Sequence, residues 1–375
     1  MKAISPIKPI TETISSKTVT FGCDPEFFFE RKGIIIGSEK VIDIKEGMML
    51  KPEMIKPGSN RATGKGESKL IVDGVQAELN PRPDTCRARL GNEISECFRM
   101  LNNQLSKDPS LKVNFAATVK ITKKELDTLA ESSKVFGCMP SKNIDCKSVN
   151  AVKLRDPKKY KYRSAGGHIH LGHGGSSYDP VTTVMKDPER LIMIMDILVG
   201  NTCVLIDRDP GNKERRKVYG RAGEFRTPSY GIEYRTLSNF WLKSYPLMSF
   251  VMSLARMSVS LLACTTPGRD YERELLSLVN PKKIQKAINT NNFEMAKANF
   301  EAIKPFLERV IPSGDSFPLN KHTIPLFEFF YKKGIDHWFK EEPIQHWINI
   351  PEGHTCGWEN FLENTVKKEL ANEKA

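Results

Sequence analysis

The chain has 375 residues, of which 39% are hydrophobic and 27% charged, and its formal net charge is +12. This composition is typical of a globular protein and excludes a disordered one, and the length suffices for one large domain or two ordinary ones. There is no uninterrupted apolar run of about 20 residues, no signal-peptide core and no CxxC pair among the eight cysteines. We therefore expect a cytoplasmic protein with free thiols.

The basic charge has two interpretations. One is a nucleic-acid or phosphorylated partner, and the other is a basic surface that could equally serve an ATP site. Lysines are spread along the whole chain, and no zinc-finger, RRM or P-loop pattern occurs. Nucleic acid stays open as a partner but is not favoured, a homo-oligomer also stays open, and no membrane partner is expected.

The first predicted element is a hairpin at residues 18–38, whose first strand contains "TFGCDPEFFFE". Alternation on that strand places Asp24 and Glu26 on one face and Phe27 and Phe29 on the other. A proline between the two acids costs a ladder hydrogen bond, and two adjacent carboxylates repel each other. Such a strand needs a reason to carry both acids.

The remaining elements follow from apolar periodicity and from turn residues. A loop rich in Gly, Pro and Lys is expected at 45–68, a strand around 112–120, and helices at 87–106, around 123–133, at 188–206 and at 246–263. From about residue 266 the pattern is mostly helical.

Three further strands repeat the arrangement of the first, with polar residues on one face and packing residues on the other. They are 69–83 with Gln76, Glu78 and Asn80, 165–172 with His168 and His170, and 230–242 with Glu233 and Arg235. A sheet of such strands has helices on its apolar face and a charged concave surface opposite. We predict an α+β fold: an N-terminal extension (1–17), a catalytic domain (18–265) and a helical C-terminal region (266–375).

Each polar pair also has a simpler interpretation: a solvated strand edge, core histidines bonded to carbonyls, or a surface ion pair. The four strands together favour a metal site, because carboxylates crowd only where cations neutralise them. Hard oxygen ligands with one or two imidazoles suit Mg²⁺ or Mn²⁺ better than zinc.

Arginines form a second pattern within 28 residues. They are Arg208, Arg215, Arg216, Arg221, Arg226 and Arg235. Forked guanidinium groups suit phosphate and carboxylate oxygens, although a salt-bridged basic loop has the same composition. Beside a carboxylate-lined metal site, they indicate metal-assisted phosphoryl transfer.

These motifs, in this order, resemble those of the glutamine synthetase-like carboxylate–amine ligases over about residues 18–250. The most similar family is the phage-encoded COOH–NH2 ligases, with the glutamate–cysteine ligases more distant. The motifs are "FGCDPEFFFE", "VDGVQAELNPRP", "RSAGGHIHLG" and "RRKVYGRAGEFRTPSYGIEYRTLSNFW". The resemblance implies a glutamine synthetase-like fold, with ATP and Mg²⁺ or Mn²⁺ as cofactors. If the protein is phage-encoded, the cytoplasm in which we expect it is that of an infected host.

The resemblance also implies roles for single residues. It implies metal ligands at Asp24, Glu26, Glu78, His168 and Glu233. It implies contacts with ATP phosphates for His170, Arg215, Arg216 and Arg221, and catalytic roles for Arg226 and Arg235. The chain departs from the family pattern twice: a second glutamate near Glu78 has no clear counterpart, and Gly231 stands where glutamine synthetases carry an arginine.

The predicted function is an ATP-dependent ligase. Phosphoryl transfer to a small-molecule or peptide carboxylate would give an acyl phosphate, and an amine would then displace phosphate to form an amide. Two alternatives stay open. A metal hydrolase using the HxH pair would need further His or Cys ligands, for which only His173 is near, and a basic nucleic-acid-binding protein would lack catalysis.

Overall fold

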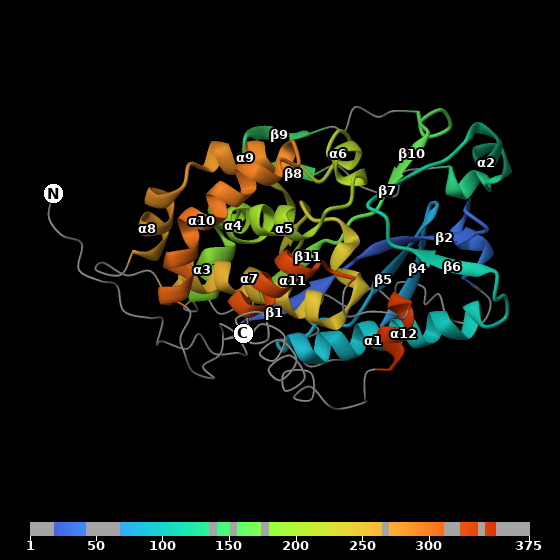
Figure 1. The fold of residues 1–375 in the computed structure, drawn as a ribbon, viewed down its shortest axis with the longest axis horizontal. Helices are drawn as coiled ribbons and strands as arrows, with labels where there is room; N and C mark the ends of the chain where they lie inside the picture. The colour runs from blue at the N-terminus through green and yellow to red at the C-terminus, as the bar shows by residue number, and fades with distance from the viewer. Residues whose placement is uncertain are drawn as a thin grey trace, which may run out of the picture.

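The computed structural model describes residues 19–42, 68–134, 141–150, 156–173, 180–264, 270–310, 323–336 and 342–349. The predicted N-terminal extension and almost all of the predicted loop at 45–68 lie outside these residues. Figure 1 shows α3, α4, α5, α8, α9 and α10 grouped on the left, and strands β2, β4, β5 and β6 on the right together with α1, α2 and α12. The predicted α+β class, with antiparallel sheets and helices, is confirmed, and the described strands divide among three sheets.

The largest sheet has the strand order β1-β11-β13-β12-β8-β9, and every pairing in it is antiparallel. Its strands are Val19–Cys23 (β1), Ile169–His173 (β11), Gly231–Tyr234 (β13), Glu224–Arg226 (β12), Ser141–Asn143 (β8) and Cys146–Asn150 (β9). The register pairs His170 with Gly22 on one side and with Glu233 on the other. The histidine strand is therefore an interior strand of this sheet, and Glu233 lies directly across from His170.

The second sheet has the order β3-β2-β5-β4, with β6 also paired to β2. Its strands are Glu26–Arg31 (β2), Ile34–Ile36 (β3), Lys69–Asp73 (β4), Gln76–Asn80 (β5) and Leu111–Asn114 (β6). The register places Glu26 opposite Glu78. A third, two-stranded sheet pairs Thr118–Lys120 (β7) with Tyr162–Ser164 (β10).

Three predicted strands prove to be two strands each. The predicted strand containing "TFGCDPEFFFE" ends as β1 at Cys23 and resumes as β2 at Glu26, in a different sheet. Pro25 lies between the two strands, so it removes no ladder hydrogen bond, and its carbonyl accepts from the Leu79 amide at 3.0 Å. The segment 69–83 is a hairpin that turns at Gly74, and 112–120 divides into β6 and β7.

The helices predicted at 87–106 and 246–263 are confirmed with small shifts at their ends. The helix predicted around 123–133 already ends at Thr128, and the one predicted at 188–206 is divided into two α-helices. The N-terminal helices are Arg87–Leu105 (α1), Lys123–Thr128 (α2), Pro180–Met185 (α3), Pro188–Met195 (α4), Asn201–Ile206 (α5) and Gly211–Arg215 (α6). Those that follow are Tyr245–Ala263 (α7), Tyr271–Leu278 (α8), Pro281–Asn289 (α9), Phe293–Val310 (α10), Thr323–Lys333 (α11) and Pro343–Ile348 (α12). A π-helical turn, Asp196–Gly200, joins α4 to α5.

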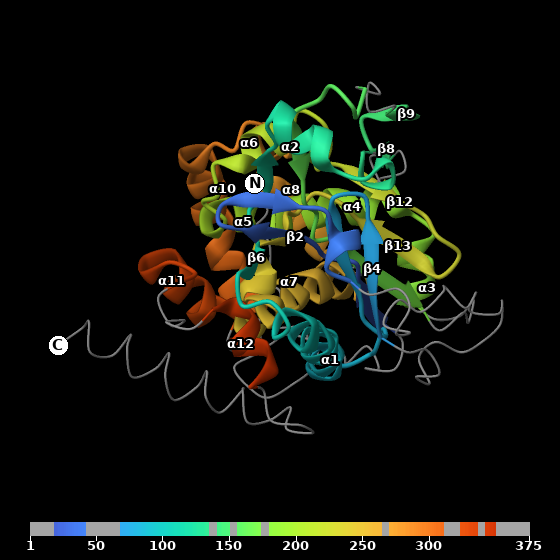
Figure 2. The ribbon, with the colours of Figure 1, turned by 90° about the vertical axis from the view of Figure 1, so that its right-hand side faces the viewer.

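Helices cover the apolar faces of the strands. Ile169, Leu171, Ile232 and Tyr234 are fully buried in one core that also contains residues of α3, α4 and α7. Helix α1 contacts β1, β4 and β5, and Figure 2 shows it beneath the second sheet beside α12. Helix α7 is long and apolar enough to cross a membrane, but 94% of its apolar window is buried inside the protein, as in a core helix.

Gly231 explains one departure from the family pattern. Its φ is +152°, and a Cβ built there would lie 2.1 Å from the carbonyl oxygen of Leu171 in the neighbouring strand. No arginine, and no side chain of any kind, fits at this position without moving β11 away from β13.

We therefore expect Gly231→Ala to lower the free energy of unfolding by about 3 kcal/mol or more, because backbone strain and a backbone clash add together. Gly33→Ala is the matched control, since Gly33 also has positive φ (+76°) but its Cβ would meet open space. Its cost should be about 1–2 kcal/mol. Urea unfolding of both variants measures the difference, and equal costs would contradict the clash.

Candidate active site

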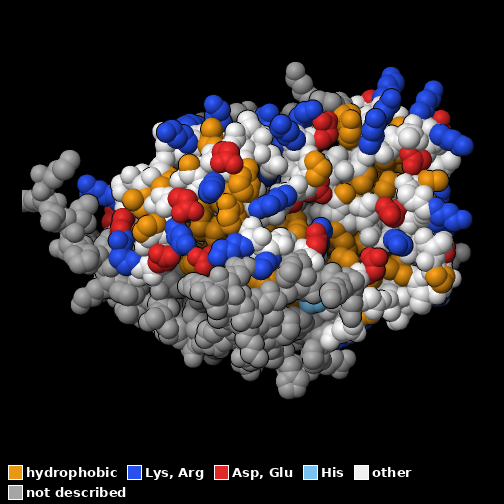
Figure 3. Space-filling model, in the orientation of Figure 1, with side chains coloured by type: hydrophobic (Ala, Val, Ile, Leu, Met, Phe, Trp, Pro, Cys, Tyr) orange, Lys and Arg blue, Asp and Glu red, His pale blue; other side chains and the backbone are white. Residues whose placement is uncertain are grey.

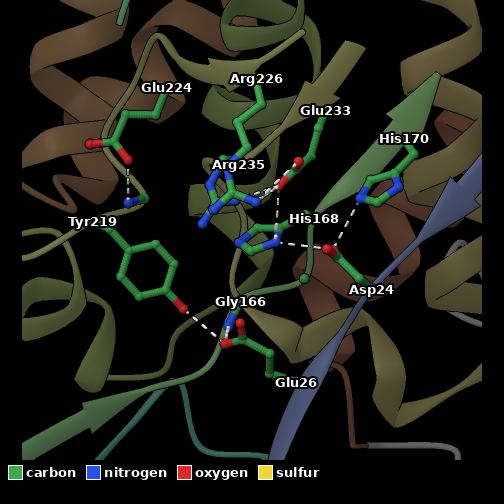
Figure 4. A network of polar contacts seen from close by, with 12 residues as sticks. Asp24, Glu26, Gly166, His168, His170, Tyr219, Glu224, Arg226, Glu233 and Arg235 are labelled. Atoms are coloured by element: carbon green, nitrogen blue, oxygen red, sulfur yellow. Dashed lines mark hydrogen bonds and ion pairs between the residues drawn. The ribbon is translucent and has the colours of Figure 1, made fainter. Parts of the chain in front are cut away.

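The polar faces of the two larger sheets meet where the chain passes from β1 to β2. Asp24 follows β1, and Glu26 begins β2, so one acid belongs to each sheet. Figure 4 shows Asp24, His168, His170 and Glu233 converging at this junction, with Glu26 nearby and directed at Tyr219 and Gly166. Among the described residues, two groups of side chains at this junction are close enough together to hold a metal ion.

The first group is Asp24, His170 and Glu233, whose ligand atoms all lie within 4.8 Å of one another. Nε2 of His170 is 3.2 Å from Oδ1 of Asp24. His168 lies beside this group, because its Nδ1 is 3.0 Å from Oδ1 of Asp24 and 3.6 Å from Oε1 of Glu233. Both predicted histidines therefore reach the same two carboxylates.

A glycine makes room for the His168 ring. A Cβ at Gly166 would lie 2.4 Å from Nε2 of His168. His168 is itself 2% exposed and precedes β11, whereas His170 lies within the strand and is partly exposed. The Gly-rich start of "GGHIHLG" is thus required by the packing of a buried imidazole.

The second group is Glu26, Asp73 and Glu78, with ligand atoms again within 4.8 Å of one another. Glu26 and Glu78 are cross-strand partners on β2 and β5, and Asp73 is the last residue of β4. The sequence analysis missed Asp73, because an Asp before Gly is also an ordinary turn signal. Asp73 supplies a further acid near Glu78, which the family pattern led us to expect and which we did not find in the sequence.

The acids perturb one another strongly. Burial raises the pKa of Glu78 well above its usual range, and the charges of Asp24, Glu26 and Asp73 raise it further. Burial and the neighbouring acids also raise the pKa of Asp73 to about 7. Burial opposes the ionisation of Asp24 too, but the two nearby imidazoles hold its pKa well below the usual range. The second group therefore lacks the positive charge that the first has.

Two of the predicted arginines reach the acids. Nη1 of Arg235, which is 1% exposed, donates to Oε1 of Glu233 at 2.5 Å. Nη1 of Arg226 lies 3.4 Å from both oxygens of the same carboxylate, and its side chain is more exposed. Figure 4 shows both guanidinium groups beside Glu233.

The other predicted arginines have different surroundings. Arg215 is fully buried, and its guanidinium donates to the carbonyls of Thr236, Arg235 and Leu237. Arg216 is also buried and donates to Oδ1 of Asn291 at 2.5 Å. Arg221 is exposed, and its Nε donates to the Arg216 carbonyl. These contacts join the loop to the scaffold and do not bring the three guanidinium groups to the acids.

The donor set fits hard divalent cations. Five carboxylates (Asp24, Glu26, Asp73, Glu78 and Glu233) share the junction with two guanidinium groups, so the acids outnumber the fixed cations. Oxygen ligands with one imidazole are the ligands that Mg²⁺ or Mn²⁺ accepts in proteins. Such an ion would relieve the repulsion that raises the pKa values of Glu78 and Asp73.

Two solved structures resemble the chain at low identity. A bifunctional glutathione synthetase from Pasteurella multocida aligns over 79% of this chain and 48% of its own, with 11% identity and a TM-score of 0.37. A structure described as a novel glutamine synthase homolog aligns over 84% of this chain and 70% of its own, with 12% identity and a TM-score of 0.33. The chain thus spans about half the length of that glutathione synthetase.

No curated protein sequence matches the chain. A family model does match, over residues 140–311. That range contains His168, His170, Glu233 and Arg235. It begins after the segments that carry Asp24, Glu26 and Glu78, and it extends past residue 265 into the helical region. Its bounds therefore differ from the expected 18–250. The resemblance predicted from the sequence is therefore confirmed over residues 140–311, which match the family described as phage phiEco32-like COOH.NH2 ligase-type 2.

Proposed function

We propose that the protein is an ATP- and Mg²⁺- or Mn²⁺-dependent carboxylate–amine ligase that forms an amide through an acyl phosphate and releases ADP and phosphate. The observation that carries this proposal is the pair of acid groups at one sheet junction, with Arg226 and Arg235 beside Glu233. The family match over residues 140–311 supports the ligase class.

Each acid group has a task in this proposal. The group with His170 and the group with Glu78 would each hold a divalent ion, and bound ions neutralise phosphate charge during transfer. Arg235 and Arg226 lie where a forked donor can orient a carboxylate or phosphate oxygen. Because both guanidinium groups touch Glu233, their positions are coupled to the first acid group.

The metal hydrolase is less well supported than the ligase. Among the described residues, the junction holds two imidazoles, those of His168 and His170, five carboxylates and no cysteine, and so oxygen-rich a donor set suits Mg²⁺ or Mn²⁺ better than zinc. The basic surface does not favour nucleic acid either. Figure 3 shows Lys and Arg spread over the visible face with Asp and Glu between them.

The substrates that we propose are small-molecule or peptide carboxylates and amines. ATP consumption therefore has to be measured against a panel of such acids and amines, with ADP release as the common signal. A panel member that raises ADP release and yields a new amide by mass spectrometry would support the proposal.

The first test of this function concerns the second acid group. Glu78→Gln and Asp73→Asn each remove one negative charge without changing shape, so each should raise the Mn²⁺ or Mg²⁺ concentration needed for half-maximal ATP turnover at least 10-fold. Asp127→Asn, on the exposed side of α2, is the matched control and should change nothing. Turnover by the wild type in excess EDTA, or unchanged metal requirements in both variants, would contradict the proposed metal role.

The second test concerns the chemistry and Arg235. An acyl-phosphate route must release ADP, whereas an adenylating ligase releases AMP. Arg235→Lys keeps the charge opposite Glu233 but loses the fork, so it should still bind ATP and lose about 10²-fold in amide formation.

Arg208→Lys is the control, because Arg208 stacks on Phe293 and donates to the Tyr331 carbonyl, away from the acids. It should retain normal turnover. AMP as the product would overturn the mechanism, and near-normal amide formation by Arg235→Lys would overturn the role of that residue.

A further inference from the structure

The segment that leads from α6 to β13 brings a tyrosine to each acid group. Tyr219 lies at its start and Tyr230 at its end, and neither was singled out in the sequence analysis. The Tyr219 hydroxyl donates to Oε2 of Glu26 at 3.0 Å, in the second acid group. The Tyr230 hydroxyl is hydrogen-bonded to Nδ1 of His170 at 2.7 Å, in the first.

Tyr219 fixes the orientation of the Glu26 carboxylate. Oε2 of Glu26 also accepts from the Gly166 amide at 2.7 Å, so two donors on different elements hold the same oxygen. Figure 4 shows Tyr219 and Gly166 approaching Glu26 together. Glu26 is 1% exposed, and a buried carboxylate held in this way cannot rotate without losing a hydrogen bond.

Arg215 packs its guanidinium group against the ring of Tyr219. Its guanidinium carbon lies 4.5 Å from the centre of the Tyr219 ring, and its nitrogens donate to the carbonyls of Arg235, Thr236 and Leu237. The buried arginine therefore ties the tyrosine to the chain that leaves β13. This gives Arg215 an indirect part in the site, through the position of Glu26.

Tyr230 fixes the imidazole of His170 in two ways. The two rings stack, with centroids 5.6 Å apart and planes 24° from parallel, and the hydroxyl engages Nδ1. The Tyr230 carbonyl accepts from the His173 amide at 3.3 Å, which ties the tyrosine backbone to β11. Nε2 of the same ring lies 3.2 Å from Oδ1 of Asp24, so a ring held by Tyr230 keeps Nε2 directed at the first acid group.

We infer that Tyr219 and Tyr230 are positioning residues, one for each acid group: Tyr219 orients Glu26, and Tyr230 orients the imidazole of His170. The inference rests on the proposed function, since the two groups matter as ligands only if they bind divalent cations. Residues that orient ligands in this way typically contribute about 10–100-fold to metal affinity.

The test is a titration of the full chain with Mn²⁺ in the absence of nucleotide. Binding is monitored by calorimetry and by the electron paramagnetic resonance signal of free Mn²⁺. The wild type should bind in two steps. Tyr230→Phe keeps the ring stacking and should weaken one step about 10-fold or more, and Tyr219→Phe should weaken the other.

Double variants assign the steps. Tyr230→Phe should have no further effect in a His170→Ala background, and Tyr219→Phe none in a Glu26→Gln background. Tyr160→Phe is the matched control, because it removes a hydroxyl that donates to Oε1 of Glu214 outside the acid groups. It should leave both affinities unchanged.

The outcomes separate the inference from the function on which it rests. Two binding steps in the wild type, both unchanged in Tyr219→Phe and Tyr230→Phe, would overturn the inference alone. Absence of any Mn²⁺ binding by the wild type would overturn the inference together with the proposed function. An equal loss of Mn²⁺ affinity in Tyr160→Phe would overturn the inference. So would a lower melting temperature of metal-free Tyr219→Phe and Tyr230→Phe with unchanged Mn²⁺ affinity, because it would show that the two tyrosines have a purely structural role.

Discussion

The repulsion among five carboxylates at one partly buried junction is the constraint on which the rest of the structure depends. Uncompensated, such a cluster opposes folding, as the raised pKa values of Glu78 and Asp73 indicate. Fixed hydrogen-bond donors of different kinds stabilise three of the carboxylates: imidazoles at Asp24, an amide and a hydroxyl at Glu26, and guanidinium groups at Glu233. The least compensated acids are those of the second group, which is where a cation would stabilise the protein most.

Short-range alternation predicted four of the five carboxylates and both histidines of this junction, but not how the chain builds it. The polar faces around Asp24, Glu78, His170 and Glu233 follow from a period of two within short segments. That period continues unchanged through Pro25, where the chain leaves one sheet for another, so alternation could not reveal the break. Asp73 was missed for a related reason: the hairpin pairs it with Gln76, and only this register places its carboxylate on the same face as Glu78 and close to it.

The arginines show a second limit of sequence reasoning. A guanidinium group suits a phosphate and a backbone carbonyl equally well, so composition cannot separate a ligand from a scaffold residue. Burial and local contacts separate them: Arg215 is used on three carbonyls, whereas Arg226 and Arg235 lie beside Glu233. The Arg-rich segment thus contains arginines that hold the backbone and arginines that lie beside the acids. Its tyrosines, Tyr219 and Tyr230, contact the acid groups, but nothing in their spacing along the sequence distinguishes them.

The apolar face of β13, opposite Glu233, explains why the helical region matters to the site. Tyr234 points away from the acids, and its hydroxyl donates to Oδ1 of Asp196 at 2.8 Å in the π-helical turn. Burial raises the pKa of Asp196 to about 8, so this acid is mostly protonated at neutral pH and adds little charge behind the cluster. A Cβ at Gly200 in that turn would lie 2.6 Å from the tyrosine hydroxyl, and α9 packs against the same turn. The predicted domain division at residue 265 stays a prediction. The apolar face of β13 nevertheless packs on the π-helical turn, which in turn contacts α9, a helix that follows residue 265. The positions of Glu233 and Arg235 on the opposite face therefore depend on this packing.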